Sequence, residues 1–461
     1  MYRIAIAYPP LESAKGVPLL TQNRQFQWFS EPTYIFPVVP ATAATLLKRE
    51  GHEVLFLDGI ASEMSSAEFE EALSRFEPDF VVLETKTPIV KRHWAWVNEH
   101  DYKVIMVGDH VTAMPEETMA CSKTYAIIPG GDWDMGLVDF FNGDLHKGIY
   151  PFALKDDISS LPWIDRDLVN WRLYSKKNGN FRRTPGTYIM AGRDCWHAKC
   201  TFCSWTTLYP RYRVRKVGDV VDEIEFLADK YGIKEIMDDS GSFPVGAWLT
   251  EFCNEMISRG LHKRVRIDCN MRFGVLERKD FALMRRAGFR LVLFGVESAN
   301  QDTLDRFRKA LKIEDVVKGC RDAHNCGLDV HLTFMFGHAW EGPKEIKSTV
   351  ELARKFLANG WASTLQCTLT VPYPGTPLFR ELDESGLLLT KDWDLYDMRM
   401  SVVKTPLASQ DDIKRAIRDV YRGFLQWGAL WHRLTTTRNL FDFSFYVRGA
   451  KSLLGHLFDF R

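Results

Sequence analysis

Apolar positions in the first 150 residues fall into short runs, separated by stretches with the spacing of amphipathic helices. Five runs read as strands: Arg3–Tyr8, Glu53–Asp58, Asp79–Glu84, Lys103–Gly108 and Tyr125–Pro129. A helical pattern over Val39–Arg49 stops at Gly51. Strands that are apolar on both faces and alternate with helices predict a parallel sheet covered on both sides. We therefore expect a Rossmann-like, doubly wound α/β domain over 1–150, with its ligand site beyond the carboxyl ends of the strands.

The alternation stops over residues 151–184, which are rich in Pro, Asp, Lys and Asn and are predicted to be a linker. It resumes over 185–378 with six strand candidates: Tyr188–Ala191, Glu235–Met237, Val265–Cys269, Arg290–Gly295, Val330–Phe336 and Thr364–Val371. Amphipathic stretches separate these runs, so the pattern predicts a partial (β/α)6 TIM barrel whose active residues lie at the carboxyl ends of its strands. Residues 379–461 are predicted to form a small helical cap, with a helical period over Asp411–Trp427.

Composition narrows the classes of function. The chain of 461 residues has 60 Lys and Arg against 60 Asp and Glu, which argues against a large nonspecific nucleic-acid surface. No uninterrupted apolar run reaches the roughly 18 residues of a membrane span, and no signal peptide is recognised. The nine cysteines are odd in number and are scattered apart from one cluster, which favours free thiols in a reducing compartment, so we expect a cytoplasmic protein. A GxGxxG string is absent after the first strand, which counts against NAD or FAD.

Three cysteines, Cys195, Cys200 and Cys203, follow the first strand of the predicted barrel within nine residues. A zinc site usually needs two ligand pairs, and here no second pair follows at zinc-finger distance, although His197 could complete a site locally. An electron-transfer cluster would want a fourth Cys, and none lies nearby. The third interpretation is a 4Fe–4S cluster held by three thiolates, whose open iron can bind a substrate or cofactor.

The cysteine loop resembles that of the radical S-adenosylmethionine (SAM) superfamily, in which the open iron chelates SAM and electron transfer cleaves it to a 5′-deoxyadenosyl radical. Four strand-end strings resemble family segments that surround SAM: Ile236–Phe243, Cys269–Arg272, Gly295–Ser298 and Thr333–Glu341. A fifth string, Pro372–Pro377, is similar to a segment of the cobalamin-binding branch. The order of these strings after the cysteine loop carries the resemblance, since each one alone is weak.

Two departures from the family pattern stand out. The first two cysteines are separated by four residues where three are usual, and we expect the extra residue to bulge outward with Trp196 or His197 at its tip. The fifth-strand segment has His338-Ala339-Trp340 where the family commonly has Leu-Pro-Gly. We expect the three sulfurs to keep the family arrangement despite the longer loop.

The N-terminal domain resembles the cobalamin-binding arrangement of the same superfamily through Glu31–Pro37, Gly51–Asp58 and Gly108–Glu116. No Asp-x-His-x-x-Gly string is present, so the resemblance implies cobalamin without a histidine ligand. The resemblance of the cysteine loop to the radical SAM superfamily implies that Cys195, Cys200 and Cys203 ligate the cluster. The implied contacts to SAM or cobalamin are Phe202, Asp239, Ser240, Arg272, Glu297, Ser298, Trp340, Thr85, Thr87, Gly108, His110, Gly130 and Tyr373.

The resemblance implies a cobalamin-dependent radical SAM enzyme, with C-methylation of an unactivated carbon as the leading activity. A cyclase or ring-rearranging enzyme with the same cofactors is the runner-up. A zinc-dependent binding module, and radical SAM chemistry without cobalamin, are the remaining alternatives. A flavodoxin or ferredoxin-like reductant is the implied partner. A protein side chain, a lipid or a small natural product would suit an aromatic-lined site as substrate, and no residue is singled out as catalytic.

Overall fold

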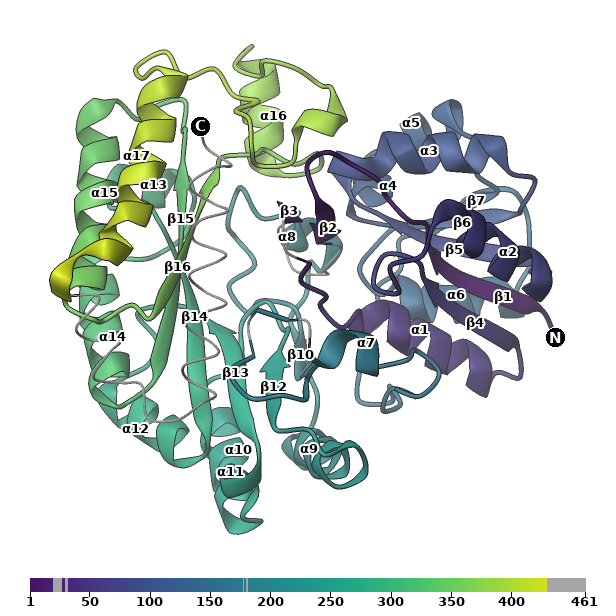
Figure 1. The fold of residues 1–461 in the computed structure, drawn as a ribbon, viewed down its shortest axis with the longest axis horizontal. Helices are drawn as coiled ribbons and strands as arrows, with labels where there is room; N and C mark the ends of the chain where they lie inside the picture. The colour runs from purple at the N-terminus through teal and green to yellow at the C-terminus, as the bar shows by residue number, and fades with distance from the viewer. Residues whose placement is uncertain (20–26, 30–31, 177, 180, 429–461) are drawn as a thin grey trace.

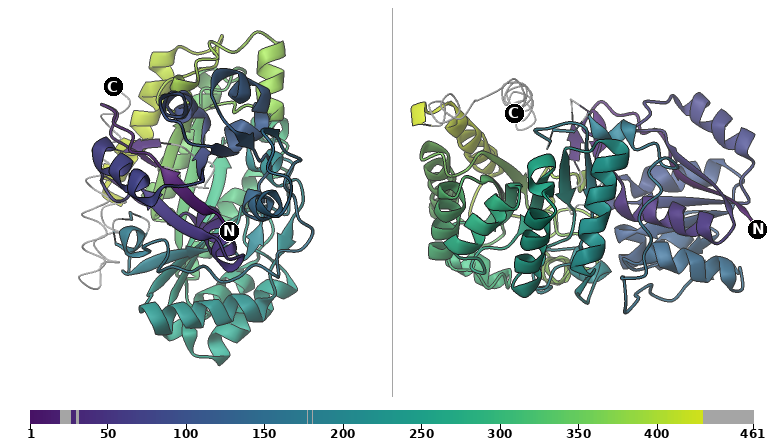
Figure 2. Two further views of the ribbon diagram at one scale, coloured as in Figure 1. Left: turned by 90° about the vertical axis from the view of Figure 1, so that its right-hand side faces the viewer. Right: turned by 90° about the horizontal axis from the view of Figure 1, so that it is seen from below.

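The structure, a computed structural model, describes residues 1–461 except 20–26, 30–31, 177, 180 and 429–461. Two α/β units lie side by side, and each is built on a six-stranded parallel sheet (Figures 1 and 2). The N-terminal unit lies at the right of Figure 1 and the second unit at the left. The predicted fold class, a doubly wound domain followed by a partial barrel, is confirmed.

The N-terminal sheet has the strand order β4-β1-β5-β6-β7-β8 and is parallel throughout. Its strands are β1 (Arg3–Tyr8), β4 (Glu53–Asp58), β5 (Phe80–Thr85), β6 (Val104–Gly108), β7 (Ala126–Ile127) and β8 (Gly148–Ile149). Its helices are α1 (Val38–Arg49), α2 (Ser66–Phe76), η1 (Thr87–Ile89), α3 (Val90–Glu99), α4 (Asp109–Ala113), α5 (Pro115–Cys121) and α6 (Trp133–Asn142). The sequence pattern missed β8 and the hairpin of β2 (Val17–Leu19) and β3 (Gln27–Phe29).

Successive side chains of the central strand β1 serve two separate cores. Ile4 and Ile6 join the cluster that contains the inner faces of α1 and α6. Ala5 and Ala7 join a second cluster with the apolar residues of α2 and α3. Because side chains alternate along a strand, a run that is apolar throughout must be covered on both faces. This packing explains why the strand signal in this part of the sequence is so clear.

The second sheet has the order β16-β15-β14-β13-β12-β9, an open half-barrel whose strands follow one another in the chain. Its strands are β9 (Gly186–Ile189), β12 (Glu235–Asp238), β13 (Arg266–Met271), β14 (Phe289–Glu297), β15 (Asp329–Phe336) and β16 (Thr364–Leu369). Its helices are α9 (Val217–Tyr231), α10 (Ala247–Ser258), α11 (Leu261–Arg264), α12 (Arg278–Arg286), α13 (Gln301–Arg306), α14 (Ile313–Asn325) and α15 (Pro343–Ala358). A two-stranded antiparallel ribbon, β10 (Gly192–Arg193) and β11 (Arg213–Val214), brackets the cysteine loop and the short helix α8 (Trp205–Leu208).

Within the described part of the predicted linker, residues 151–184 without 177 and 180, lies the short helix α7 (Arg172–Ser175). Arg166 is fully buried and its guanidinium lies 4.5 Å from the centre of the Phe36 ring. The same guanidinium donates to Thr187 Oγ1 at 2.7 Å, which ties the linker to β9. These contacts join the segment just before α1 of the first unit to β9 in the sheet of the second.

The segment after the last strand returns to the N-terminal unit. It contains α16 (Pro377–Glu384), η2 (Trp393–Leu395), α17 (Gln410–Arg422) and η3 (Gly423–Leu425). The predicted boundary at 378 falls within α16, and Trp393 of η2 donates to Glu117 Oε1 of α5 at 3.0 Å. Helix α17 packs on α15, and residues 429–461 of the predicted cap lie outside the described residues. Among the helices that the structure describes, none combines the length and apolarity needed to span a membrane.

Candidate functional site

The three cysteines lie on the loop between β10 and α8, at the carboxyl edge of the second sheet. Cys195 and Cys203 are buried, and Cys200 is half-buried. The loop is held by backbone hydrogen bonds of Thr201, which donates to the Phe307 carbonyl at 3.1 Å and accepts from Leu378 N–H at 2.9 Å. Within the part of the chain that the structure describes, no three His, Cys, Asp or Glu side chains are arranged to hold a metal ion. The predicted arrangement of the three sulfurs stays a prediction.

Two cations lie beside Cys200. The guanidinium of Arg272, which follows β13, is 3.7 Å from the Cys200 sulfur. The same guanidinium donates to the Lys309 carbonyl, which joins it to the loop between α13 and α14. Burial raises the pKa of the Cys200 thiol, while the positive charges of Lys309 and Arg272 oppose that rise. The site therefore favours negative charge on this sulfur more than burial alone would allow.

The extra residue of the cysteine loop does not place Trp196 or His197 at an outward tip, so that prediction is wrong. The Arg272 guanidinium lies 5.3 Å from the centre of the Trp196 ring, within reach of a cation–π contact. His197 Nε2 lies 2.7 Å from the Arg308 carbonyl oxygen. Both rings therefore pack against neighbouring segments, and Lys199 is the exposed residue of this stretch.

Glu297 ends β14 in the left-handed backbone region, with φ of 69°. Its Oε1 accepts from Lys309 Nζ at 2.6 Å, and Lys309 also donates to the Gly295 carbonyl at 2.5 Å. Thr333 of β15 donates to Oε2 at 3.3 Å. A non-glycine residue in this backbone region is uncommon, and such strain gathers at functional sites. The predicted candidate Glu297 thus lies in one charged group with Arg272 and Lys309.

The ends of β14 and β15 are joined through the buried carboxylate of Glu341. Its Oε1 accepts from Ser298 and from Thr303, each at 2.7 Å, and from Asn300 at 3.1 Å. The indole of Trp340 donates to Thr303 Oγ1 at 3.0 Å. The hydroxyl of the predicted contact Ser298 and the indole N–H of Trp340 are therefore engaged within the protein.

The remaining barrel candidates lie on neighbouring strand ends. Ser240, which follows β12, accepts from Gly192 N–H through its hydroxyl at 2.9 Å, so it fixes the start of the cysteine loop. Asp239 is buried. Burial lowers the pKa of Lys86 in the N-terminal unit, but the negative charges of Asp109, Glu84 and Asp239 together raise that pKa above its usual value. The Phe202 ring lies 4.8 Å from that of Phe307. Tyr373 donates to the Tyr396 carbonyl at 3.3 Å and so faces the C-terminal segment.

The five N-terminal candidates lie at the ends of β5, β6 and β7, and several of them pack within the unit. Thr85 and Thr87 bond to histidines: His93 Nδ1 lies 2.9 Å from Thr85 Oγ1, and His110 Nδ1 lies 3.2 Å from Thr87 Oγ1. A Cβ at Gly108 would lie 2.4 Å from the Thr85 carbonyl oxygen, and one at Gly130 would lie 2.5 Å from that of Ala153. The two glycines therefore allow close backbone approach at the edge that faces the second unit. Their contacts to a cofactor stay predictions.

Several buried polar atoms around the cysteine loop have no hydrogen-bond partner among the described residues. They are Trp196 Nε1, Tyr212 Oη, Ser242 Oγ and Arg272 Nε. Buried polar atoms are nearly always satisfied in folded proteins, so a group of unsatisfied ones calls for a ligand with donors and acceptors. The three cysteine sulfurs are suitable ligands for iron. Arg272, Lys309 and Glu297 provide positive and negative charges for the carboxylate and amino groups of a zwitterion. The residues present therefore fit an iron–sulfur cluster and SAM.

Comparison with known proteins gives this geometry a family. Residues 189–353 match the model of the radical SAM superfamily. The chain carries a radical SAM domain. The matched region runs from the last residue of β9 through most of α15, and it contains all three cysteines together with Arg272 and Glu297. A radical SAM domain implies a 4Fe–4S cluster and SAM, as the cysteine loop predicted.

Relatives are similar over most of the chain. An uncharacterised methyltransferase of Pyrococcus horikoshii is 27% identical over 416 residues, covering 82% of this chain and 85% of that protein. An anaerobic magnesium-protoporphyrin IX monomethyl ester cyclase of Cereibacter sphaeroides is 26% identical over 433 residues, covering 85% and 68%. The similarity to both proteins extends well beyond residues 189–353, the part of the chain that matches the radical SAM model.

Solved structures confirm the fold. The radical SAM methyltransferase TsrM of Kitasatospora setae, with cobalamin and a 4Fe–4S cluster bound, superposes with a TM-score of 0.63 at 17% identity, covering 84% of this chain and 75% of that one. The cobalamin-dependent radical SAM enzyme OxsB, with aqua-cobalamin and SAM bound, superposes with a TM-score of 0.68 at 13% identity, covering 99% and 72%. At identities this low the likeness is one of fold alone, and it covers both α/β units.

The sequence patterns missed several charged residues of the site. Lys309 lies in a loop between two helices, away from the strand ends where the pattern placed its candidates. Glu341 ends the string Thr333–Glu341 but was not among the predicted contacts. Arg193, two residues before Cys195, was missed although it is buried beside Asp132 and Asp134. A charged residue adjoining a predicted cluster ligand is a signal that could have identified it.

Proposed function

We propose that the chain is a cobalamin-dependent radical SAM enzyme that methylates an unactivated carbon. The observation that carries the proposal is the contact between the cysteine loop and the carboxyl edge of the N-terminal sheet. Gly131, which follows β7, donates from its N–H to the Leu208 carbonyl at 2.9 Å, and Tyr209 donates to the Gly131 carbonyl at 2.8 Å. The ligand edge of a doubly wound domain therefore adjoins the cysteine loop of a radical SAM domain.

The residues divide into two groups in this proposal. Cys195, Cys200 and Cys203 hold the cluster. SAM is held by the group around Arg272 and Glu297, with Phe202, Asp239, Ser240, Ser298 and Trp340 on the same rim. Cobalamin would be held at Thr85, Thr87, Gly108, His110 and Gly130, together with Tyr373. When bound, the cluster and SAM supply radical chemistry and cobalamin supplies the methyl group; the chain itself positions these groups and excludes water.

Within the radical SAM domain, each charged residue has a separate part. Lys309 neutralises Glu297 and holds its carboxylate in place at 2.6 Å. Arg272 keeps positive charge beside Cys200 and covers Trp196. Glu341 holds the ends of β14 and β15 in register through Ser298 and Thr303. These contacts preorganise a polar rim, which reduces the cost of ordering a flexible zwitterionic ligand.

Methyl transfer is favoured over cyclisation by the relatives, which include a hopanoid C-3 methylase and a bacteriochlorophyllide d C-12(1)-methyltransferase. The cyclase remains the second candidate, because the Cereibacter sphaeroides cyclase is similar over 85% of this chain. We infer that a flavodoxin or ferredoxin-like protein delivers the electron in the cytoplasm. The substrate class stays open between a protein side chain, a lipid and a small natural product.

The proposal is tested with the full chain purified and reconstituted without oxygen. We expect stoichiometric iron, sulfide and corrinoid, and release of 5′-deoxyadenosine when SAM and a reductant are added. With SAM labelled at its methyl group, the label should appear in the corrinoid and then in the product. A labelled corrinoid without a labelled product, together with ring closure of a substrate, would instead support the cyclase.

Two cysteine variants provide the matched comparison. Cys200→Ala should lose bound iron and SAM cleavage, because it removes one of three cluster ligands. Cys253→Ala, at a buried thiol on α10, should keep both. Stoichiometric zinc without sulfide in the wild-type chain, or SAM cleavage by Cys200→Ala, would refute the radical SAM proposal. Wild-type protein that cleaves SAM but binds no corrinoid would refute the cobalamin part alone.

A further inference from the structure

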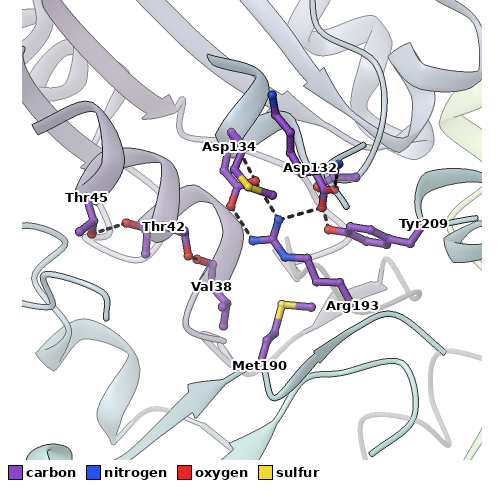
Figure 3. A network of polar contacts seen from close by, with 12 residues as sticks. Val38, Thr42, Thr45, Asp132, Asp134, Met190, Arg193 and Tyr209 are labelled. Carbon is purple, nitrogen blue, oxygen red and sulfur yellow. Dashed lines mark hydrogen bonds and ion pairs between the residues drawn. The ribbon is translucent and has the colours of Figure 1, made fainter. Parts of the chain in front are cut away.

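A buried group of four charges joins the two units at the base of the cysteine loop. The guanidinium of Arg193 lies between the carboxylates of Asp132 and Asp134 (Figure 3). It donates to Asp132 Oδ1 at 3.0 Å and to both oxygens of Asp134, at 2.9 Å and 2.5 Å. Arg213 forms an ion pair with Asp132 from the other side. The two arginines come from the ribbon that brackets the loop, and the two aspartates from the start of α6 in the N-terminal unit.

The ribbon places these two arginines opposite each other. Arg193 and Arg213 are cross-strand partners of β10 and β11, where like charges repel. Asp132 bridges them, because its Oδ1 accepts from Arg193 and also from Arg213 at 3.3 Å. Both aspartates and both arginines are buried, so two positive and two negative charges balance away from water. The N-terminal unit therefore supplies the carboxylates that neutralise both arginines of the ribbon that carries the cysteine loop.

The far end of the cysteine loop is fastened to the same short segment. Gly131 directly precedes Asp132, and its N–H and C=O bond to Leu208 and Tyr209, which follow Cys203 by a few residues. A Cβ at Gly131 would lie 2.1 Å from the Tyr209 ring, so the ring lies directly on this backbone. Residues 131–134 thus contact the chain on both sides of the three cysteines.

We propose that Arg193, Asp132 and Asp134 are positioning residues that set the distance and orientation of the iron–sulfur cluster relative to cobalamin. This inference rests on the proposed function, because it assigns a role between the two cofactor sites. A stability role alone does not require charge here: replacing a buried ion pair by uncharged residues of similar size is often neutral or stabilising. A charged pair with bidentate geometry instead fixes one docking arrangement, since a shift of the loop would separate buried charges.

The test uses a pair replacement that keeps the charges balanced. In Arg193→Met/Asp134→Asn, Asp132 still pairs with Arg213, and the Asn side chain can still accept the 2.9 Å hydrogen bond from Met135 N–H. Each single variant leaves an uncompensated buried charge, so each should lower Tm more than the double variant does. The double variant should therefore fold, and should retain wild-type iron and corrinoid content.

The deciding measurement is the dipolar EPR interaction between cob(II)alamin and the reduced cluster in the holoenzyme. We expect the double variant to show a broader distance distribution with a shifted mean. Arg259→Met/Asp222→Leu, which removes an exposed ion pair between α9 and the residue that follows α10, should match the wild type. A distribution in Arg193→Met/Asp134→Asn identical to that of the wild type would overturn the positioning role. Wild-type protein without corrinoid or cluster signals would instead refute the proposed function itself.

Discussion

Burial makes His93, on α3, a source of acid sensitivity. The ring is fully buried, Nδ1 lies 2.9 Å from Thr85 Oγ1, and Nε2 has no hydrogen-bond partner among the described residues. Burial lowers the pKa of His93 from 6.5 to about 3, and the positive charge of Arg92 adds to that effect. Between these values the unfolded chain binds a proton that the folded chain excludes. The free energy of unfolding should therefore fall as pH drops below 6.5, by up to about 1.4 kcal/mol per pH unit from this residue.

Urea unfolding at pH 7, 6 and 5 measures this slope. His93→Gln keeps a polar side chain toward Thr85 but cannot be protonated, so its stability should fall less steeply toward pH 5. His146→Gln, at an exposed histidine, should follow the wild-type pH profile. Parallel profiles for wild type and His93→Gln would contradict the assignment of acid sensitivity to His93.

Single residues at the site were predictable where family spacing placed them at strand ends. The spacing of the cysteines predicted the cysteine loop, and the strings at the ends of β13 and β14 predicted Arg272 and Glu297. Lys309 escaped because the sequence does not show that the segment after α13 turns back to Glu297 and Arg272. Arg193, the charged partner that Asp132 and Asp134 share, lies 61 and 59 residues away from them along the chain. A buried charge is recognised by its partners, and those are set by tertiary packing.

Among the short segments, the Gly131 turn should tolerate no side chain. A Cβ there would lie 2.1 Å from the Tyr209 ring, and moving the ring would break its 2.8 Å hydrogen bond to the Gly131 carbonyl. Overpacking of this kind costs roughly 1–3 kcal/mol. We therefore expect Gly131→Ala to lower the free energy of unfolding by about that amount, as measured by denaturant unfolding.

A second glycine provides the control for the Gly131 turn. Gly218 lies in α9, and a Cβ there would meet no heavy atom within 4 Å. Gly218→Ala should be neutral or stabilising by up to about 1 kcal/mol, because alanine favours the helix. Equal effects of the two substitutions would show that the Tyr209 contact does not hold the turn.

Element length explains which parts of the fold could be predicted. The long apolar strands β1, β5 and β14 leave a clear signal, because each buries both of its faces. The two-residue strands β8, β10 and β11 are too short for any hydrophobic period. Trp196 and His197 were misplaced for a related reason. The sequence gives no sign that the cysteine loop packs on Arg272 and the Arg308 carbonyl.

The two units share a hydrophobic core as well as the charged group beside the cysteines. One apolar cluster contains Ala5 and Met106 of the N-terminal sheet together with Val371 and Leu378, which follow β16. Close approach is possible because Gly375, at φ of 82°, has no side chain: a Cβ there would lie 2.9 Å from that of Ala113 in α4. The segment after the barrel therefore stabilises the N-terminal unit, and the two sheets should unfold together.

Trp393 of η2 is the side chain on which this shared stability should depend. It is buried, its ring lies 5.3 Å from that of His110, and its indole donates to Glu117 at 3.0 Å. Trp393→Ala should cost about 3–5 kcal/mol, because it leaves a cavity between the units. Native-state hydrogen exchange should then show earlier opening of β5 and β6 than of β14 and β15, whereas all four strands should open together in the wild type.

Trp427→Ala, at an indole that is 88% exposed, should leave exchange unchanged. If Trp393→Ala lowered protection equally in both sheets, the units would form one cooperative body that does not depend on this contact.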